Sequence, residues 1–420
     1  MFQVLSASWA LLLGMGLLMV GNGLQGTLLG VRGGIEGFST FEMSVVMSAY
    51  FVGFLGGSWM TPDLIRRVGH VRVFAALASF ISAVLVLYAT WANPWVWTAL
   101  RVVIGFCFSG VYVTAESWLN NAASNDTRGK ALSLYMIVQT IGIIVAQALL
   151  LVAEPGGYVL FIIPSVLVSI SFAPILLSIS PTPAFETAKR MSLREIMEIS
   201  PLGCVGMFIL GGIFSAQFGM SAVYGGAIDL TLVEISIFVS VFYIGATLVQ
   251  YPLGWVSDRM DRRLLIMGVA LVGGVGAMIG ASFGGRDFNM LLVAAFLVGG
   301  MSNPLYSLLI AYTNDFIEAD DMAAVSGGLV FINGLGAVAG PVVTGWAMGI
   351  IGPHGYFLFL GVLLFAMAAY AAYRMTQRAA TPVEETVGYQ PVLMSTSPVA
   401  VEVAIETAIE EQETADETGN

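Results

Sequence analysis

Long apolar runs alternate with short polar segments along most of the chain. Each run is about 20 residues long, roughly the length that a helix needs to cross the hydrocarbon core of a bilayer. The pattern therefore predicts an all-α integral membrane protein, and an even number of spans places both termini on the same side. The predicted spans are twelve, at 5–29, 43–62, 71–92, 95–118, 131–152, 157–179, 201–224, 235–256, 262–283, 289–312, 324–349 and 353–374.

Positive charge follows the same rhythm. Of the 16 Lys and Arg residues, 13 lie in five polar segments at every second gap between apolar runs. Short cytoplasmic loops of membrane proteins carry such an excess of positive charge, so we expect both termini to be cytoplasmic in a multi-pass protein of the cell (inner) membrane. The five segments hold Arg66, Arg67 and Arg72; Arg128 and Lys130; Lys189, Arg190 and Arg194; Arg259, Arg262 and Arg263; and Arg374 and Arg378.

Composition agrees with a membrane protein, because only 10% of the residues are charged and 57% are apolar. A soluble domain carries roughly 25% charged residues. Most of the net charge of −11 comes from residues 379–420, which contain nine acidic residues and no Lys or Arg. We therefore predict that residues 376–420 form an acidic, disordered cytoplasmic tail.

The spans divide into two sets of six. The predicted domains are an N-terminal six-helix bundle at 1–179, a cytoplasmic linker at 180–200 and a C-terminal six-helix bundle at 201–375. A basic turn joins the second and third spans of each half, at Arg66–Arg72 and at Arg259–Arg263. Tandem halves with matching loops are typical of transporters built from structural repeats.

Three motifs resemble those of the major facilitator superfamily. Gly254-x-x-x-Asp258-Arg259-x-x-Arg262-Arg263 is similar to the signature loop of that family, with Asp261 where glycine is usual. Arg101-x-x-x-Gly105 resembles its fourth-helix signature, and Gly336-x-x-x-Gly340-Pro341 resembles a glycine-proline pattern of the fifth or eleventh helix. Within the family, the segments 66–70 and 116–120 resemble the YcaD-type branch. The resemblance implies twelve helices in two pseudo-symmetric six-helix bundles.

Two charged residues lie inside one predicted span. Ionisable groups within a membrane are costly and mark candidate functional sites, so Arg101 and Glu116 are candidates for solute binding or ion coupling. They lie 15 residues apart, about 22 Å along a helix, so they do not pair with each other. The alternative for Glu116 is a structural ion pair with Arg66, Arg67 or Arg128.

Uncharged polar residues complete the candidate site. The family resemblance places spans 1, 4, 7 and 10 around a central path, which would be lined there by polar and aromatic side chains. Each of these residues could instead be a hydrogen-bonding contact between helices. The cavity candidates are Asn22, Gln25, Arg101, Tyr112, Gln217, Tyr224, Asn303 and Tyr306.

The basic turn after span 8 is a candidate gate. Asp258 is placed to accept hydrogen bonds from the N-terminus of a neighbouring helix, where exposed N–H groups favour a carboxylate. Arg259, Arg262 and Arg263 would pair with carboxylates of adjoining helices and hold one state closed. The alternative is that the turn only sets the orientation of the chain in the membrane.

These features favour a secondary transporter that moves a small organic solute by alternating access, with protons as the candidate coupling ion and efflux as the first choice of direction. Uptake of a small, anionic metabolite is the alternative, followed by a non-transporting membrane sensor or scaffold. No nucleotide-binding signature, nucleophile motif or metal-ligand spacing occurs in the sequence. We therefore expect no enzymatic activity, no cofactor or metal, no nucleic acid, a bilayer environment and no need for an oligomer.

Overall fold

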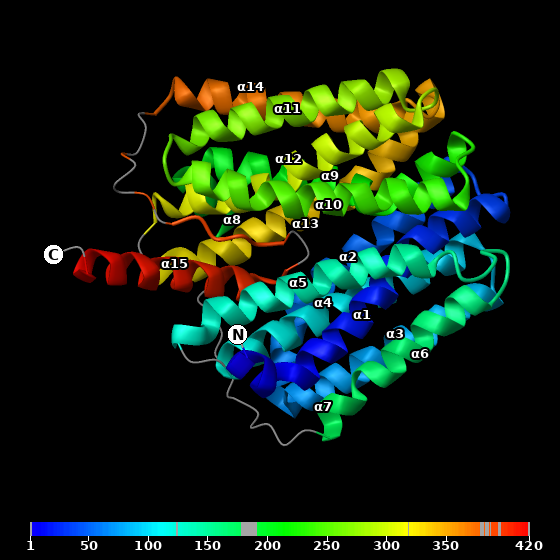
Figure 1. Cartoon of the computed structure of the whole chain (residues 1–420), viewed down its shortest axis with the longest axis horizontal. Coiled ribbons are helices and arrows are strands. Elements are labelled where there is room, and N and C mark those ends of the chain that lie inside the picture. Colours follow the sequence, from blue (N-terminus) through cyan, green and yellow to red (C-terminus); the bar gives the residue numbers. More distant parts are fainter. Residues whose placement is uncertain are drawn as a thin grey trace. The chain divides into compact units, whose positions relative to one another are not determined.

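The structure of the chain is a computed structural model, and it describes residues 2–122, 125–177, 191–317, 319–378, 382, 386, 388–393 and 396–418. All regular structure in these residues is α-helical (Figure 1). The helices are α1 (Phe2–Ile35), α2 (Thr40–Val68), α3 (His70–Thr90), α4 (Pro94–Ala122), α5 (Asn125–Leu149), α6 (Val159–Ser171), α7 (Ala173–Leu177), α8 (Leu193–Ile199), α9 (Pro201–Ala227), α10 (Leu232–Ser257), α11 (Arg262–Phe283), α12 (Phe288–Asn314), α13 (Ala319–Ile351), α14 (Gly355–Met375) and α15 (Pro398–Thr418).

The predicted fold class is confirmed, because twelve helices in the described residues are long and apolar enough to cross a membrane. Several of them extend beyond the predicted apolar runs. The second span was predicted at 43–62, but α2 begins at Thr40 and continues through Pro62 to Val68. Hydrophobicity delimits only the part of a helix inside the hydrocarbon, whereas backbone hydrogen bonding continues into the polar ends.

Local signals set several helix ends. Ser39 caps α2, and its side chain and that of Glu42 satisfy each other's backbone N–H groups in a capping box. Gly69 separates α2 from α3 with a φ of 84°, a conformation that glycine adopts without steric cost. The described part of the predicted linker 180–200 contains α8. This helix begins with another capping box, formed by Ser192 and Glu195. Residues 178–190 of this region lie outside the described residues.

The chain divides into two compact units. Unit 1 comprises Met1–Thr187, Ser215–Ser240 and Val338–Tyr356, and unit 2 comprises Ala188–Phe214, Val241–Ala337 and Phe357–Asn420. Parts of α9, α10 and α13 group with the first six spans because they pack on them. Ser48 of α2 donates a hydrogen bond to the Val338 carbonyl (2.5 Å), and Ser236 of α10 donates to the Gln147 carbonyl (2.6 Å).

Close packing of α2 and α4 positions the centre of unit 1. A Cβ atom at Gly105 would lie 1.9 Å from the Tyr50 carbonyl oxygen, and one at Gly53 would lie 1.9 Å from that of Val102. Only glycine permits this approach, so α4 lies directly against α2. Gly105 is one helical turn from Arg101, and the contact therefore brings Arg101 next to the side chains of α2.

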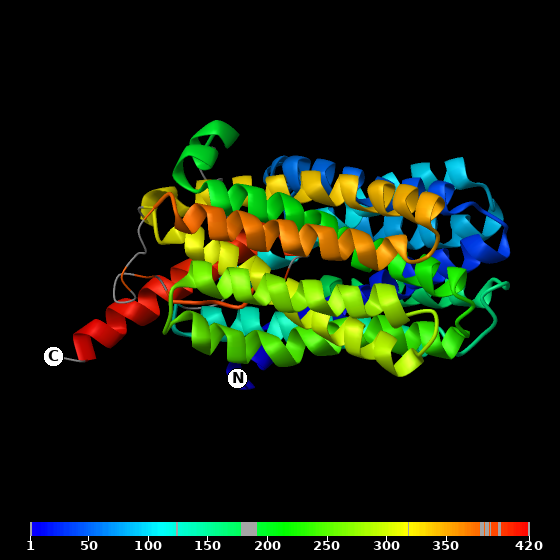
Figure 2. The ribbon, with the colours of Figure 1, turned by 90° about the horizontal axis from the view of Figure 1, so that it is seen from above.

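In unit 2, α11 packs along α12. The C-terminal end of α10 and the helix α15 lie at the same end of this unit (Figures 1 and 2). Pro398–Thr418, within the segment predicted as an acidic tail, forms α15. Its first half has apolar side chains at Val401, Ala404, Ile405 and Ala408, and all of them are buried. This amphipathic pattern supplies the apolar burial that a helix needs.

Candidate functional site

A hydrogen-bonded chain of buried side chains runs through unit 1. Arg101 of α4 donates to the Gln25 side-chain oxygen of α1 (3.0 Å), and Gln25 donates to Asn22 (3.1 Å). Asn22 then donates to the hydroxyl of Tyr112 (3.0 Å), which itself contacts the sulfur of Met19 (3.2 Å). Four of the predicted cavity residues are thus joined in one network between α1 and α4.

Arg101 is fully buried at 0% exposure, and its neighbours are neutral. The guanidinium carbon lies 4.8 Å from the centre of the Tyr50 ring, a cation–π geometry, and one terminal nitrogen lies 3.3 Å from the Met47 sulfur. In the described part of the chain, no carboxylate pairs with Arg101 and its Nε atom has no hydrogen-bond partner.

This environment leaves a positive charge only partly compensated. A buried charge is costly unless an opposite charge and a full set of hydrogen bonds stabilise it. Gln25 supplies one hydrogen bond, Tyr50 a ring face and Met47 a weak acceptor. Arg101 therefore retains both a donor group and an unmatched charge that an anion can satisfy.

Aromatic side chains surround the same point. Tyr50 lies 5.6 Å from Phe218, 6.0 Å from Phe54 and 6.5 Å from Phe108, measured between ring centres. The predicted residue Gln217 precedes Phe218 in α9 and is 8% exposed. The region around Arg101 thus combines one cationic group with an aromatic wall.

Tyr224, another predicted cavity residue of α9, belongs to a separate aromatic contact. Its ring stacks on that of Tyr356 at 4.8 Å and lies 5.8 Å from that of Phe238. The hydroxyl of Tyr356 shares a hydrogen bond with Ser221 (2.8 Å), one turn before Tyr224. These contacts favour a packing role for Tyr224.

The two predicted residues of α12 belong to unit 2. The side-chain nitrogen of Asn303 donates to the Gly299 carbonyl of its own helix (3.3 Å). Tyr306 is fully buried. Pro304 lies between them and cannot donate the backbone hydrogen bond expected within a helix.

Glu116 lies in unit 1 with a different set of neighbours from Arg101. It is 2% exposed and accepts a hydrogen bond from the Tyr135 hydroxyl of α5 (3.0 Å). Arg66, one of its predicted partners, forms an ion pair with Asp63 instead. The two charges of α4 are therefore placed in separate polar environments, as their spacing predicted.

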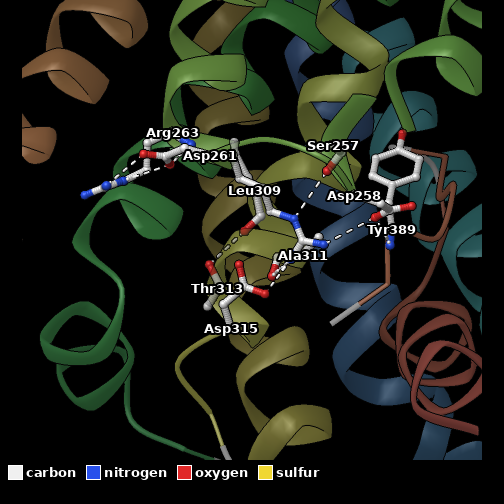
Figure 3. A network of polar contacts seen from close by, with 10 residues as sticks. Ser257, Asp258, Asp261, Arg263, Leu309, Ala311, Thr313, Asp315 and Tyr389 are labelled. Carbon is white, nitrogen blue, oxygen red and sulfur yellow. Dashed lines mark hydrogen bonds and ion pairs between the residues drawn. The ribbon is translucent and has the colours of Figure 1, made fainter. Parts of the chain in front are cut away.

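The candidate gate is built around Arg262, at the first turn of α11. Figure 3 labels its partners Ser257, Ala311 and Asp315. The guanidinium of Arg262 forms a buried ion pair with Asp315, which follows α12, and the two side chains are 2% and 3% exposed. It also donates to the Ser257 hydroxyl (3.2 Å) and the Ala311 carbonyl (3.2 Å). Arg262 thus pairs with a carboxylate at the end of an adjoining helix.

The other two arginines of the loop have partners within the loop or on backbone carbonyls. Arg263 pairs with Asp261 of its own turn (2.8 Å) and donates to the Arg378 carbonyl (2.6 Å). Arg259 donates to the Trp255 carbonyl (2.9 Å) and stacks over the Trp255 ring at 4.2 Å. Burial raises the pKa of the Asp261 carboxyl, but the hydrogen bonds from Arg263 outweigh it and the pKa falls below its ordinary value.

Asp258 also has a partner that was not predicted. Its carboxylate accepts a hydrogen bond from the backbone N–H of Tyr389 (2.9 Å) rather than from a helix N-terminus, and it lies 3.5 Å from Arg262 (Figure 3). Asp315 could have been identified as a partner of the loop from the sequence, because it is an acidic residue directly after α12. Nothing in the tail sequence indicated that Tyr389 would bind the signature loop.

Comparison with known proteins gives a consistent result. Residues 11–227 and 202–401 match the sequence profile described as Major Facilitator Superfamily. The chain is 25% identical over 342 residues to the uncharacterized MFS-type transporter YcaD of Escherichia fergusonii, covering 80% of this chain and 88% of that protein. It is 24% identical over 362 residues to YcaD of Salmonella arizonae, covering 84% and 92%.

Solved structures share the fold. The nucleoside transporter NupG, as a D323A mutant, superposes with a TM-score of 0.77 at 14% identity, covering 87% of this chain and 99% of that chain. A bacterial homologue of the human lysosomal transporter Spinster, in an inward-facing and unoccupied conformation, gives a TM-score of 0.68 at 13% identity, covering 96% and 98%. At this identity the likeness concerns the fold alone.

Proposed function

This chain belongs to the major facilitator superfamily, and on that premise we propose that it carries a small organic solute across the cell membrane by secondary transport with alternating access. The main observation that supports this proposal is the buried hydrogen-bonded network of Arg101, Gln25, Asn22 and Tyr112. A charge this deep inside a membrane protein is retained at a cost, and solute or ion binding is the usual reason.

The same surroundings support a class of solute. The unmatched charge of Arg101 favours a ligand with an anionic group, and a guanidinium can bind a carboxylate or phosphate through two parallel hydrogen bonds. Tyr50 and Phe218 offer ring faces next to it. We therefore propose an organic anion with an apolar or aromatic body, a class that includes the anionic solute of the uptake alternative.

Alternating access requires some of the contacts within unit 1 to separate. The hydrogen bonds of Ser48 with Val338 and of Ser236 with Gln147 join helices of the two halves. Single hydrogen bonds contribute only about 0.5–1.5 kcal/mol each, so such contacts can be exchanged during a transport cycle. For coupling we propose the proton, with Glu116 as the buried carboxylate that takes it up.

Proteoliposomes containing the purified protein test this function. Flux of a carboxylate-bearing aromatic solute is measured against its uncharged amide analogue, in both directions and with and without a pH gradient. Saturable flux of the anion that exceeds that of the amide supports the proposal, and the response to the gradient gives the coupling and the direction. Absence of saturable flux for a broad panel of organic anions would contradict it and favour a sensor or scaffold.

A cytoplasmic location of the basic segments is the orientation we propose. Cysteine in place of Arg194, whose side chain is 90% exposed, is expected to resist an impermeant thiol reagent in intact cells and to react after lysis. Cysteine in place of Arg286, in an exposed loop of the opposite side, should react in both. Labelling of position 194 in intact cells would reverse the orientation.

Asp258 is expected to matter for the transport rate more than for folding. Its side chain is 40% exposed, so Asp258→Asn should leave the amount of folded protein unchanged. The substitution removes the charge that attracts Arg262 and weakens acceptance from Tyr389, and we expect a change in maximal flux of about threefold, corresponding to one modest hydrogen bond. Arg259→Ala is the matched control, because among the described residues the polar and ring contacts of Arg259 are with Trp255. Equal flux in both variants and the wild type would leave the loop as an orientation signal.

A further inference from the structure

The C-terminal segment binds inside unit 2 through a serine of α12. The hydroxyl of Ser307 accepts a hydrogen bond from the Val392 N–H (2.9 Å) and donates one to the Val392 carbonyl (3.2 Å). Both residues are buried, at 1% and 2% exposure. One side chain therefore satisfies both backbone groups of Val392, and main-chain hydrogen bonds of this kind contribute to the binding of a peptide segment.

Tyr389 forms the second anchor, on α10. Its N–H donates to Asp258, and its ring lies on Gly254, where an added Cβ atom would approach the ring to 2.5 Å. Glycine at this point of the signature loop thus makes room for the tyrosine. Burial raises the pKa of the Tyr389 hydroxyl above its ordinary value, in keeping with a ring that is enclosed rather than lying on the surface.

The docking point is deep. Ser307 lies seven residues before Asn314, the last residue of α12, or about 10 Å along the helix axis. It directly follows Tyr306, one of the cavity candidates. After this point the chain is also held, because Thr396 and Ser397 are buried and α15 presents a buried apolar face.

We propose that residues 388–393 form a tethered plug: α10 and α12 carry a binding site for an extended peptide, the chain's own tail occupies it, and the tail must leave before solute can pass this end of unit 2. The inference rests on the proposed transport function. It makes transport self-limiting, because the docked segment binds Ser307, the residue that follows the cavity candidate Tyr306. It also links the plug to the signature loop through Asp258, which binds both Tyr389 and Arg262.

A disulfide between Ser307→Cys and Val392→Cys tests the closed state in the full-length protein. The 2.9 Å separation of the Ser307 hydroxyl and the Val392 nitrogen brings the two side-chain positions together, and the native Cys107 and Cys204 are buried. Oxidation is expected to abolish flux, and reduction of the same sample should restore it. Equal flux before and after reduction, with the cross-link verified by mass, would overturn the plug.

A release variant tests the open state. Val392→Asp places a charge at a buried position, whereas Pro391→Asp places the same charge at the exposed neighbour and is the matched control. Burial of a valine side chain shifts an equilibrium by roughly tenfold or more, so Val392→Asp should undock most of the tail. We expect a severalfold higher maximal flux for Val392→Asp and wild-type flux for Pro391→Asp.

Docking is measured independently of transport with Thr396→Cys, a fully buried reporter. Its reaction with a thiol reagent should accelerate about tenfold when combined with Val392→Asp and stay slow when combined with Pro391→Asp. Equal labelling in both, or lower flux in Val392→Asp than in the wild type, would overturn the plug. A failure of the proposed function looks different, because flux would then be absent from the wild type and from the reduced cross-linked protein alike.

Discussion

Replacing Arg101 by methionine is expected to weaken the apparent affinity for the solute by about tenfold or more and, in the same protein, to raise thermal stability. Arg101 is fully buried, and no carboxylate of the described residues pairs with it. An apolar side chain of similar length removes the cost of the buried charge, as replacement of other buried charged groups by apolar residues has shown. Functional sites often lower stability in this way.

The variants of Arg101 separate charge from geometry. Arg101→Ala and Arg101→Lys should both weaken apparent affinity by about tenfold or more, since a hydrogen bond to a charged group contributes about 1.5–3 kcal/mol and lysine lacks the planar fork. Arg286→Ala, in an exposed loop, is the control and should behave as the wild type. Wild-type kinetics in Arg101→Ala would remove this residue from the site. If Arg101→Met were less stable than the wild type, the charge of Arg101 would be compensated by its neighbours in the folded wild-type protein.

The second large effect is expected at the ion pair of Arg262 and Asp315. Loss of one partner leaves a buried charge without compensation, so Arg262→Ala and Asp315→Asn should each destabilise the protein by about 3–5 kcal/mol. The double replacement Arg262→Met with Asp315→Leu should be much less harmful than either single change. Thermal unfolding in detergent measures all three.

A second ion pair of unit 2 provides the matched control. Arg194 and Glu198 are 3.1 Å apart, but their side chains are 90% and 65% exposed. Arg194→Ala should therefore change stability by no more than about 1 kcal/mol. If Arg262→Ala proved as mild as Arg194→Ala, the buried pair would contribute nothing beyond a surface contact.

The membrane spans were predictable because one physical requirement determines them. A helix in lipid must be about 20 residues long and apolar, and loops at one side must be basic, so the sequence alone located all twelve helices. Their ends were less accurate, as at α2, because the ends lie in a polar environment that hydrophobicity does not delimit. The predicted grouping of Asn22, Gln25, Arg101 and Tyr112 rested on a family resemblance and on rare polar residues in apolar spans.

Contacts between distant segments were harder to predict. The hydrogen bond of Arg101 to Gln25 depends on the rotation of α1 and α4 about their axes. The tail was judged by average composition, which favours disorder, although Val401, Ala404 and Ile405 carry a helical apolar pattern. In the sequence, Ser307 looks like the other serines of the membrane spans. Only the structure shows that it forms hydrogen bonds with the Val392 backbone.

The docked tail also has a consequence for the order in which the protein is made. Residues 388–393 leave the ribosome after α10 and α12 have been synthesised, since domains of a growing chain form from the N-terminus onward. During that interval Ser307 has no Val392 backbone to bind, and Asp258 has no Tyr389 N–H. Unit 2 is thus assembled into the bilayer with this binding site vacant, and a segment that is synthesised later fills it. Every newly made molecule passes through an unplugged stage before residues 388–393 close it.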